Sequence, residues 1–366
     1  MPNSNRFTEF CVKGLEPAYI PSERVFATRR LEEGKMVHVR DREIEYLATM
    51  NALMGLHRAR SHGSKVFLDI ESDYLATAAR LKEYPGSSLH IAATFWTGRC
   101  LGTPIPPHAL SLFKEILENT ARKNYPDTKS MTWAIVACLT GDDEYHKDAL
   151  ALAKAAGERY INQKTLLVRQ VRDGIRENWA SFGAHSLMAY ALLLLARKTG
   201  DTWARDMGLS IARKLVQLQG TKGQWGWMYH VPSGRLVDFY PVFSVHQYGY
   251  AAFFLVEAID QGYEEFREPF VRGFQWVLGQ NELGQTMVAP EHQLIWRYII
   301  RKPPNPILNK MLRATATYLG LQKAAPLAAD LLQIDQQCWG FEMALPLCIF
   351  SGRLDFPEIL NATCFS

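Results

Sequence analysis

The stretch AYALLLLARKTGDTWARDMGLSIARKLVQLQGTKGQW, residues 189–225, decides the fold. It begins as an apolar helix, turns at Gly200, continues as an amphipathic helix and ends in a polar loop. Gly200 suits the position after a helix end, because glycine accepts the left-handed conformation needed there. Asp201 can then cap the second helix. The stretch therefore predicts a tight hairpin of two helices.

The same order of elements recurs in two other stretches. They are TWAIVACLTGDDEYHKDALALAKAAGERYINQKT, residues 132–165, and AAFFLVEAIDQGYEEFREPFVRGFQWVLGQNELGQT, residues 251–286. Their turn glycines, Gly141 and Gly262, lie 59 residues before and 62 residues after that of the first stretch, and Asp142 is a second candidate cap. A repeat of roughly 60 residues predicts about six hairpins in this chain.

The two helices of a hairpin differ in character. Residues 190–196 and 250–256 are apolar on every side, whereas residues 201–219 carry charges on one face only. A helix that is apolar all round is buried, and an amphipathic helix lies at the surface. Period-two strand patterns are nearly absent from the chain. We therefore expect an all-α protein in which outer helices surround a closed ring of inner helices.

This expected arrangement resembles the (α/α)6 toroid superfamily, an α/α barrel of about six helical hairpins. The resemblance covers about residues 44–350 and concerns architecture. We expect one toroid domain over residues 44–366. Residues 1–43 are expected to form an N-terminal arm packed on it, irregular over residues 1–40, because Pro17, Pro21 and Gly34 interrupt any periodic pattern.

A local motif points to a narrower resemblance. Gln219, Gly223 and Trp225 stand in the order Q-x3-G-x-W, which looks like the QW motif of squalene-hopene-type terpenoid cyclases. That resemblance implies that Gln219 caps neighbouring helix ends and that Trp225 stacks on it. The DxDD motif that protonates an alkene in that family is missing. The acidic strings at 69–73 and 142–146 fit neither that motif nor the metal-binding DDxxD.

Composition excludes several classes of protein. Lys and Arg number 41 against 37 Asp and Glu, without basic blocks, so no nucleic-acid partner is expected. The first residues lack a signal-peptide pattern and no apolar run approaches a membrane span, so we expect a cytoplasmic protein. No HExxH, P-loop or strand-anchored GxGxxG occurs, so we expect neither a metal nor a cofactor. The oligomeric state stays open.

A funnel of side chains is expected at one end of the ring, because all inner helices of an α/α ring begin at the same end. Ligand pockets are mostly apolar with a few placed polar groups, and loops longer than about 12 residues are usually functional or disordered. Residues 219–255 combine both properties and form the main candidate site. The segment carries Trp227, Tyr229, Asp238, Tyr240 and His246.

Two other segments that lead into inner helices add the same mixture of side chains. One holds Glu177 and is followed by His185 within the next helix, and the other holds Trp339 and Glu342. Asp238, Glu177 and Glu342 are candidate general acids or bases. His246 and His185 are candidate proton carriers or hydrogen-bond donors.

A fourth stretch, EHQLIWRYIIRK at residues 291–302, contributes a candidate anion-binding group. As a helix it would place Arg297 and Arg301 on one face, where guanidinium groups bind a carboxylate or phosphate. A surface helix with a basic face explains the same pattern. If Arg297 faces the funnel, a uronic acid or a pyrophosphate-bearing substrate would follow.

The candidate residues favour carbohydrate chemistry. The aromatic faces of Trp227, Tyr229, Tyr240 and Trp339 suit sugar rings, whose hydroxyls pair with carboxylates and histidines, although such faces would also shield a carbocation. The leading hypothesis is a carbohydrate-active hydrolase, lyase or epimerase acting by acid–base chemistry on an oligosaccharide or uronic-acid-containing glycan. The alternatives are a terpenoid-cyclase-like enzyme on a prenyl substrate and a non-catalytic glycan-binding or scaffold protein.

Several candidates also have a structural explanation. Ser244 and Gln247 form S-x-x-Q before an apolar run, which predicts a capping box. Glu177 can pair with Arg172 or Arg176 on a solvated face. His185, on an otherwise apolar helix, can be a core histidine with satisfied hydrogen bonds.

Overall fold

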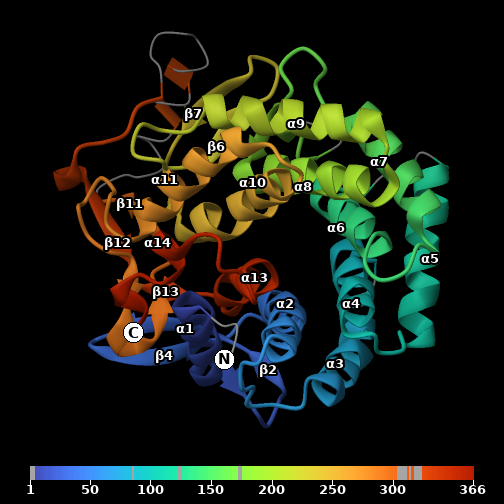
Figure 1. The fold of residues 1–366 in the computed structure, drawn as a ribbon, viewed down its shortest axis with the longest axis horizontal. Coiled ribbons are helices and arrows are strands. Elements are labelled where there is room, and N and C mark those ends of the chain that lie inside the picture. The colour runs from blue at the N-terminus through green and yellow to red at the C-terminus, as the bar shows by residue number, and fades with distance from the viewer. Residues whose placement is uncertain are drawn as a thin grey trace.

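The computed structural model describes residues 5–84, 86–122, 126–171, 175–302, 311–312, 315–316 and 324–366. Within this part of the chain, six inner helices form a closed ring in which each packs on the next, and outer helices surround the ring (Figure 1). The predicted all-α toroid is confirmed. The inner helices are α2 (Arg42–Ser61), α4 (Ser88–Leu101), α6 (Thr128–Cys138), α8 (Phe182–Thr199), α10 (Ala251–Asp260) and α13 (Gly340–Phe350).

Each outer helix follows its inner helix along the chain, with one exception. The first helix of the chain is the outer partner of the last inner helix, α13. They are α1 (Arg6–Leu15), α3 (Ile70–Ala79), α5 (Pro107–Ala121), α7 (His146–Tyr160), α9 (Thr202–Gln217) and α11 (Arg267–Val277). The remaining short helix and single turns are α14 (Pro357–Leu360), η1 (Glu16–Ala18), η2 (Arg80–Glu83), η3 (Ile175–Asn178), η5 (Glu264–Phe266), η6 (Pro290–His292), η7 (Ala329–Leu331) and η8 (Thr363–Phe365).

The turns of the three repeats are built as the sequence predicts. Gly141, Gly200 and Gly262 have φ angles of 83°, 74° and 91°, in the region that favours glycine. Asp201 caps α9 by accepting a hydrogen bond from the backbone N–H of Ala204 at 2.7 Å. Because α8 is buried almost all round and α9 on one face only, the first lies inside and the second outside.

The ring is closed by both ends of the chain. Helix α1 packs on α13, and Asn5 caps α1 by accepting from the backbone N–H of Thr8. The amide of Asn5 also donates to the carbonyls of Phe350 and Arg353, at 2.9 and 3.0 Å. The prediction of irregular structure is therefore wrong over Arg6–Leu15. A helix of ten residues is marginal in isolation, and this one is stabilised by its contact with the other end of the chain.

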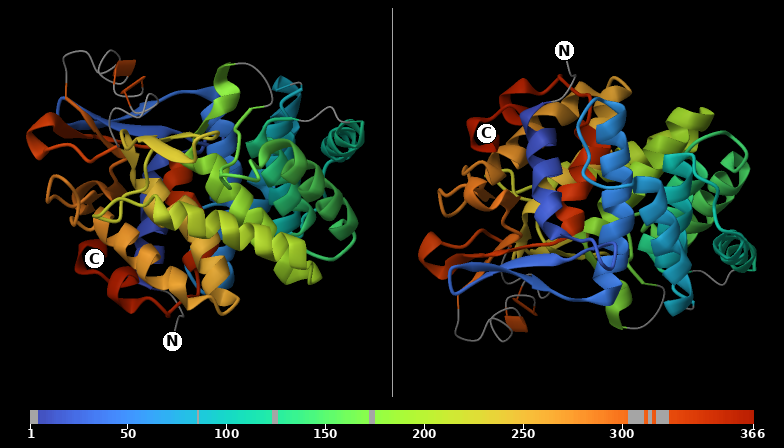
Figure 2. Two further views of the ribbon diagram at one scale, coloured as in Figure 1. Left: turned by 90° about the horizontal axis from the view of Figure 1, so that it is seen from above. Right: turned by 90° about the horizontal axis from the view of Figure 1, so that it is seen from below.

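Short antiparallel strands gather on one side of the ring, where the inner helices begin (Figure 2). The sequence shows almost no period-two strand pattern, because strands of two to five residues are too short to display one. The three-stranded sheets are β5 (Trp179–Ser181), β6 (Met228–His230) and β7 (Arg235–Asp238); β8 (Val242–Phe243), β11 (Tyr298–Arg301) and β12 (Leu332–Asp335); and β3 (Thr28–Glu32), β4 (Lys35–Val39) and β13 (Gln337–Cys338). The pairs are β1 (Tyr19–Ile20) with β2 (Val25–Phe26) and β9 (Val288–Ala289) with β10 (Leu294–Ile295).

Gln219 links the end of α9 to α11 by hydrogen bonds. Its amide donates to the carbonyls of Gly223 and Pro269, at 2.8 and 2.9 Å, and its carbonyl accepts from Arg272 at 2.6 Å. Trp225 is fully buried and stacks on Phe182 with 5.1 Å between ring centroids.

Two predicted helix caps are wrong. Asp142 binds Arg99 at 2.7 Å, and α7 begins only at His146. Ser244 donates to the carbonyl of Trp296, and the Gln247 amide donates to that of Phe243. The S-x-x-Q pattern is therefore used to hold neighbouring segments and forms no capping box.

Candidate active site

Three strands lead directly into inner helices and deliver candidate side chains to one end of the ring. Strand β5 precedes α8, β13 precedes α13, and β8 precedes the π-helical turn η4 (His246–Tyr250), which continues as α10. The turn η4 contacts both α8 and α13. π-helical turns occur often at functional sites. The three helix starts therefore define one candidate site.

His246 opens η4 and is enclosed by aromatic rings. Its ring lies 5.0 Å from Phe182 and 4.9 Å from Phe243, and it is parallel to Trp227 within 10° at 6.0 Å. The side chain is only 4% exposed, and Nδ1 has no hydrogen-bond partner within the described residues. Burial, and then the charge of Arg297, lowers the pKa of His246 to about 3. The imidazole is therefore neutral at physiological pH, and its unprotonated ring nitrogen can accept a hydrogen bond.

A buried ion pair lies next to this histidine. Nε of Arg297 is 3.0 Å from Oε1 of Glu342, and their side chains are 10% and 1% exposed. The guanidinium carbon of Arg297 lies 3.1 Å from the ring centroid of Trp339, whose backbone N–H donates to Glu342 at 2.9 Å. Burial raises the pKa of Glu342 to about 7, against the opposing effect of Arg297. Glu342 can therefore exchange a proton near neutral pH.

A second carboxylate near Glu342 escaped the sequence analysis. Asp335 on β12 faces Tyr298 on β11 in the strand register, and its charge contributes to the raised pKa of Glu342. Burial raises the pKa of Asp335 itself. Gln337 donates to the hydroxyl of Tyr298 at 2.7 Å and accepts from Arg30 at 3.2 Å. Pairing of β11 with β12 brings these residues together, and no motif in the sequence predicts that pairing.

An aromatic cavity of about 290 Å³ is lined in part by Trp227, the ring that lies parallel to His246. Its walls include Trp179 and Ser181 of β5, Trp227, Met228 of β6 and Gln170. Trp227 thus faces this cavity and also lies over the imidazole. A flat ring in this position can bind the face of a ligand in the cavity.

A larger cavity of about 510 Å³ lies where α2, α4 and α6 begin, at the same end of the ring. His90 lines it, hydrogen-bonds through Nδ1 with Ser87 at 2.6 Å and stacks on Tyr84 at 4.4 Å. Burial lowers the pKa of His90. The sequence pattern did not predict this histidine, because it lies outside the three stretches that show the helical repeat.

Asp238 and Tyr240 are held in a separate polar cluster. Asp238 forms a buried ion pair with Arg301 at 2.5 Å and accepts from the backbone N–H of Tyr240. The hydroxyl of Tyr240 donates to Glu282 at 3.1 Å and accepts from the backbone of Leu327. These contacts give both residues structural partners.

His185, Tyr229 and Glu177 also have structural partners. His185 is fully buried and accepts through Nδ1 from the backbone N–H of Val168 at 3.3 Å, and burial lowers its pKa to about 3. The ring of Tyr229 packs against it at 4.8 Å. Glu177 pairs with Arg169 at 3.2 Å. The side chains of Arg172 and Arg176, its predicted partners, lie outside the described residues.

The stretch at residues 291–302 is not a helix. It forms the end of η6, strand β10 and strand β11, because its β-branched and aromatic residues pair with neighbouring strands. Arg297 and Arg301 consequently do not share a helix face. Arg297 binds Glu342, and Arg301 binds Asp238.

The described part of the chain holds neither a metal-binding cluster nor a membrane-spanning helix. No group of three His, Cys, Asp or Glu side chains there is placed to hold a metal ion. None of its helices has both the length and the apolar character needed to cross a bilayer.

The fold is similar to that of several solved structures. A D-mannose isomerase is 12% identical with a TM-score of 0.60, over 93% of this chain and 95% of that chain. A sugar epimerase from a ruminal bacterium is 10% identical with a TM-score of 0.61, over 94% and 96%. A possible member of the GH105 family from Salmonella enterica is 10% identical with a TM-score of 0.56, over 94% and 92%.

These similarities define the fold of the chain as the (α/α)6 toroid. No protein-family model matches the chain, and no curated protein matches its sequence. None of the three structures above is described as a terpenoid cyclase. The QW resemblance carried by Gln219 and Trp225 therefore gains no support.

Proposed function

We propose that this chain is a carbohydrate-active enzyme that works by acid–base chemistry where the inner helices begin. The observation that carries the proposal is the neutral imidazole of His246, parallel to Trp227 and close to the buried Arg297–Glu342 pair. The names of the structural neighbours, an isomerase and an epimerase of sugars among them, support the same class.

The reaction that suits these groups is isomerisation or epimerisation of an open-chain sugar. His246 would take the proton from the carbon next to the carbonyl, and the electron pair would move to the carbonyl oxygen to give an enediolate. Arg297 would stabilise that negative oxygen, since a guanidinium is a strong charged donor. Return of the proton to the former carbonyl carbon, with transfer of the hydroxyl proton from the second oxygen to the first, gives a ketose. Return to the opposite face of the same carbon, from Glu342, gives an epimer.

Hydrolysis of a glycoside is the second candidate. It is favoured by Glu342 and Asp335, two carboxyls with raised pKa values, since the charge of Asp335 adds to the rise in the pKa of Glu342. Glycosidases use such a pair, one as acid and one as base or nucleophile. A raised pKa keeps the acid protonated near neutral pH.

One experiment separates these reactions. The protein is incubated in D2O with a panel of aldoses, neutral disaccharides and uronic-acid-containing oligosaccharides, and products are followed by proton NMR. Isomerisation or epimerisation introduces deuterium at the carbon next to the carbonyl, and His246→Asn should abolish it. Hydrolysis releases new reducing ends without that exchange, and Asp335→Asn should abolish it. Binding seen by thermal shift without either reaction would favour a non-catalytic glycan-binding protein.

A further inference from the structure

A second cavity, of about 370 Å³, lies at the opposite end of the ring, where the inner helices end. Every inner helix contributes to its lining, directly or through the residue that follows it. Its lining includes Arg58 of α2, Cys100 of α4, Leu139 after α6, Tyr190 of α8, Phe253 of α10 and Cys348 of α13. The cavity is therefore formed by the ring as a whole.

This cavity shares no lining residue with the two cavities at the helix starts. His246 and Phe253 lie seven residues apart on η4 and α10, which corresponds to about 10 Å along a helix axis. Met50 and Trp133, on the middle of α2 and on α6, are buried. The cavity at the helix ends is thus a site of its own.

The walls and the rim of this cavity differ in chemistry. Trp96, Tyr190 and Phe253 supply aromatic rings to the walls, and the rings of the last two pack together at 4.8 Å. Arg58 and Lys198 lie on the rim and are exposed. An aromatic wall with a few convergent charges is the usual composition of a small-molecule site.

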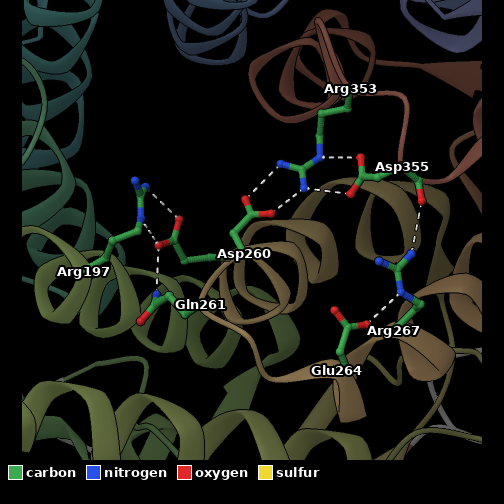
Figure 3. Close-up of polar contacts among 8 residues, drawn as sticks. Arg197, Asp260, Gln261, Glu264, Arg267, Arg353 and Asp355 are labelled. Atoms are coloured by element: carbon green, nitrogen blue, oxygen red, sulfur yellow. Dashed lines mark hydrogen bonds and ion pairs between the residues drawn. The ribbon is translucent and has the colours of Figure 1, made fainter.

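The two rim cations differ from other cations near this end of the ring. Several of those are paired with acids, as Figure 3 shows for Arg197, Arg267 and Arg353. Within the described residues, neither Arg58 nor Lys198 has a carboxylate partner. The paired ones are Arg197 with Glu257, Arg353 with Asp260 and Asp355, Arg267 with Glu264, and Arg99 with Asp142.

Stabilisation of helix ends explains only part of this pattern. A cation in the last turn of a helix gains about 0.3–1 kcal/mol from the helix dipole, and both Arg58 and Lys198 occupy such turns. The same effect acts on Arg197, which nevertheless has Glu257 as a partner. Arg58 and Lys198, which face the cavity, have no such partner among the described residues.

We propose that this cavity binds a small organic anion with a ring body and one phosphate or carboxylate group. The ring lies between the walls formed by Trp96, Tyr190 and Phe253, and the anionic group is bound by Arg58 and Lys198. Charge-assisted hydrogen bonds to such a group are stronger than neutral ones. The site is independent of the reaction proposed above, because none of these residues belongs to the catalytic machinery.

Calorimetric titration tests this proposal with four probes. Phenyl phosphate, benzoate and glucose 6-phosphate carry a ring and an anionic group, and inorganic phosphate carries the anion alone. We expect at least one ring-bearing probe to bind more tightly than inorganic phosphate. Binding of phenyl phosphate and benzoate, but not of glucose 6-phosphate, would identify the ligand as aromatic. Binding of glucose 6-phosphate, but not of the other two, would identify it as a sugar derivative.

Matched variants locate the binding. Arg58→Gln combined with Lys198→Gln should weaken the best probe at least tenfold, while the exposed pair Arg235→Gln with Lys147→Gln should leave its affinity unchanged. The melting temperature of each variant reports that it is folded. Equal affinity in both double variants, or no ring-bearing probe tighter than phosphate, would overturn the proposal.

Discussion

Nε of Arg297 lies 3.0 Å from Oε1 of Glu342, and both side chains are almost completely buried. Arg297 comes from the segment before β11, and Glu342 comes from the first turn of α13. The pair therefore joins the segment before β11 to the start of α13. The charge of Arg297 also acts on His246.

Removing the guanidinium should destabilise the fold in a pH-dependent way. In Arg297→Gln, Glu342 stays buried without its partner, and loss of one member of a buried pair costs about 3 to 5 kcal/mol. The loss should be larger at pH 8 than at pH 5, because Glu342 can take up a proton at the lower pH. Urea unfolding at both values measures it. The double variant Arg297→Gln with Glu342→Gln should recover part of the stability, and an equal loss at both pH values would contradict the account.

Glu342 should make the wild-type protein less stable as pH rises. The folded protein keeps this proton up to about pH 7, whereas the unfolded chain releases it near pH 4.5. The stabilisation is complete below pH 4.5 and is lost as pH rises through 7. It amounts to about 3 kcal/mol. Glu342→Gln should remove this slope from the pH dependence of the unfolding free energy; a slope identical to wild type would show that Glu342 is ionised throughout.

Trp227 should contribute to ligand affinity through its face. Trp227→Leu removes the ring that lines the aromatic cavity and lies over His246. Aromatic contacts contribute about 0.5–1.5 kcal/mol, so we expect sugar affinity to fall about two- to tenfold. Trp203→Leu, on the outer helix α9 with Lys154 over its ring, is the control and should leave affinity unchanged. Calorimetry on both variants measures the difference.

Asn5 should contribute more stability than an ordinary helix cap. Asn5→Ala removes the cap of α1 and two hydrogen bonds to the end of α13. A cap is worth about 1 kcal/mol, and each further hydrogen bond adds about 1 kcal/mol. Asp201→Ala, which removes only the cap of α9, should cost less. Equal unfolding free energies for these two variants would mean that Asn5 does not help to close the ring.

The sequence predicted the ring because its signals are local. Gly200 and Asp201 mark the turn within a single hairpin, and the contrast between α8 and α9 distinguishes inner from outer helices. The prediction failed for α1, because its stability depends on a helix more than 300 residues away in the chain. It failed for residues 291–302 because residues four apart in the chain, such as Arg297 and Arg301, share one face in a strand as well as in a helix.

The candidate site was predictable only in part. His246, Trp227, Trp339 and Glu342 stand next to inner helix starts, and the structure brings them together with Arg297. Asp335 joins them because β12 pairs with β11. Strands this short carry no sequence pattern from which their pairing could be predicted. Asp238 was a candidate general acid or base, but its charge is matched by Arg301, 63 residues later.

The central claim is that His246 takes a proton from a sugar carbon. The most direct test is proton NMR of wild type and His246→Asn in D2O with the sugar that gives the largest thermal shift. The account predicts deuterium at the carbon next to the carbonyl with wild type and its loss with the variant, while both proteins melt at similar temperatures. Deuterium incorporation at the same rate in His246→Asn would contradict it.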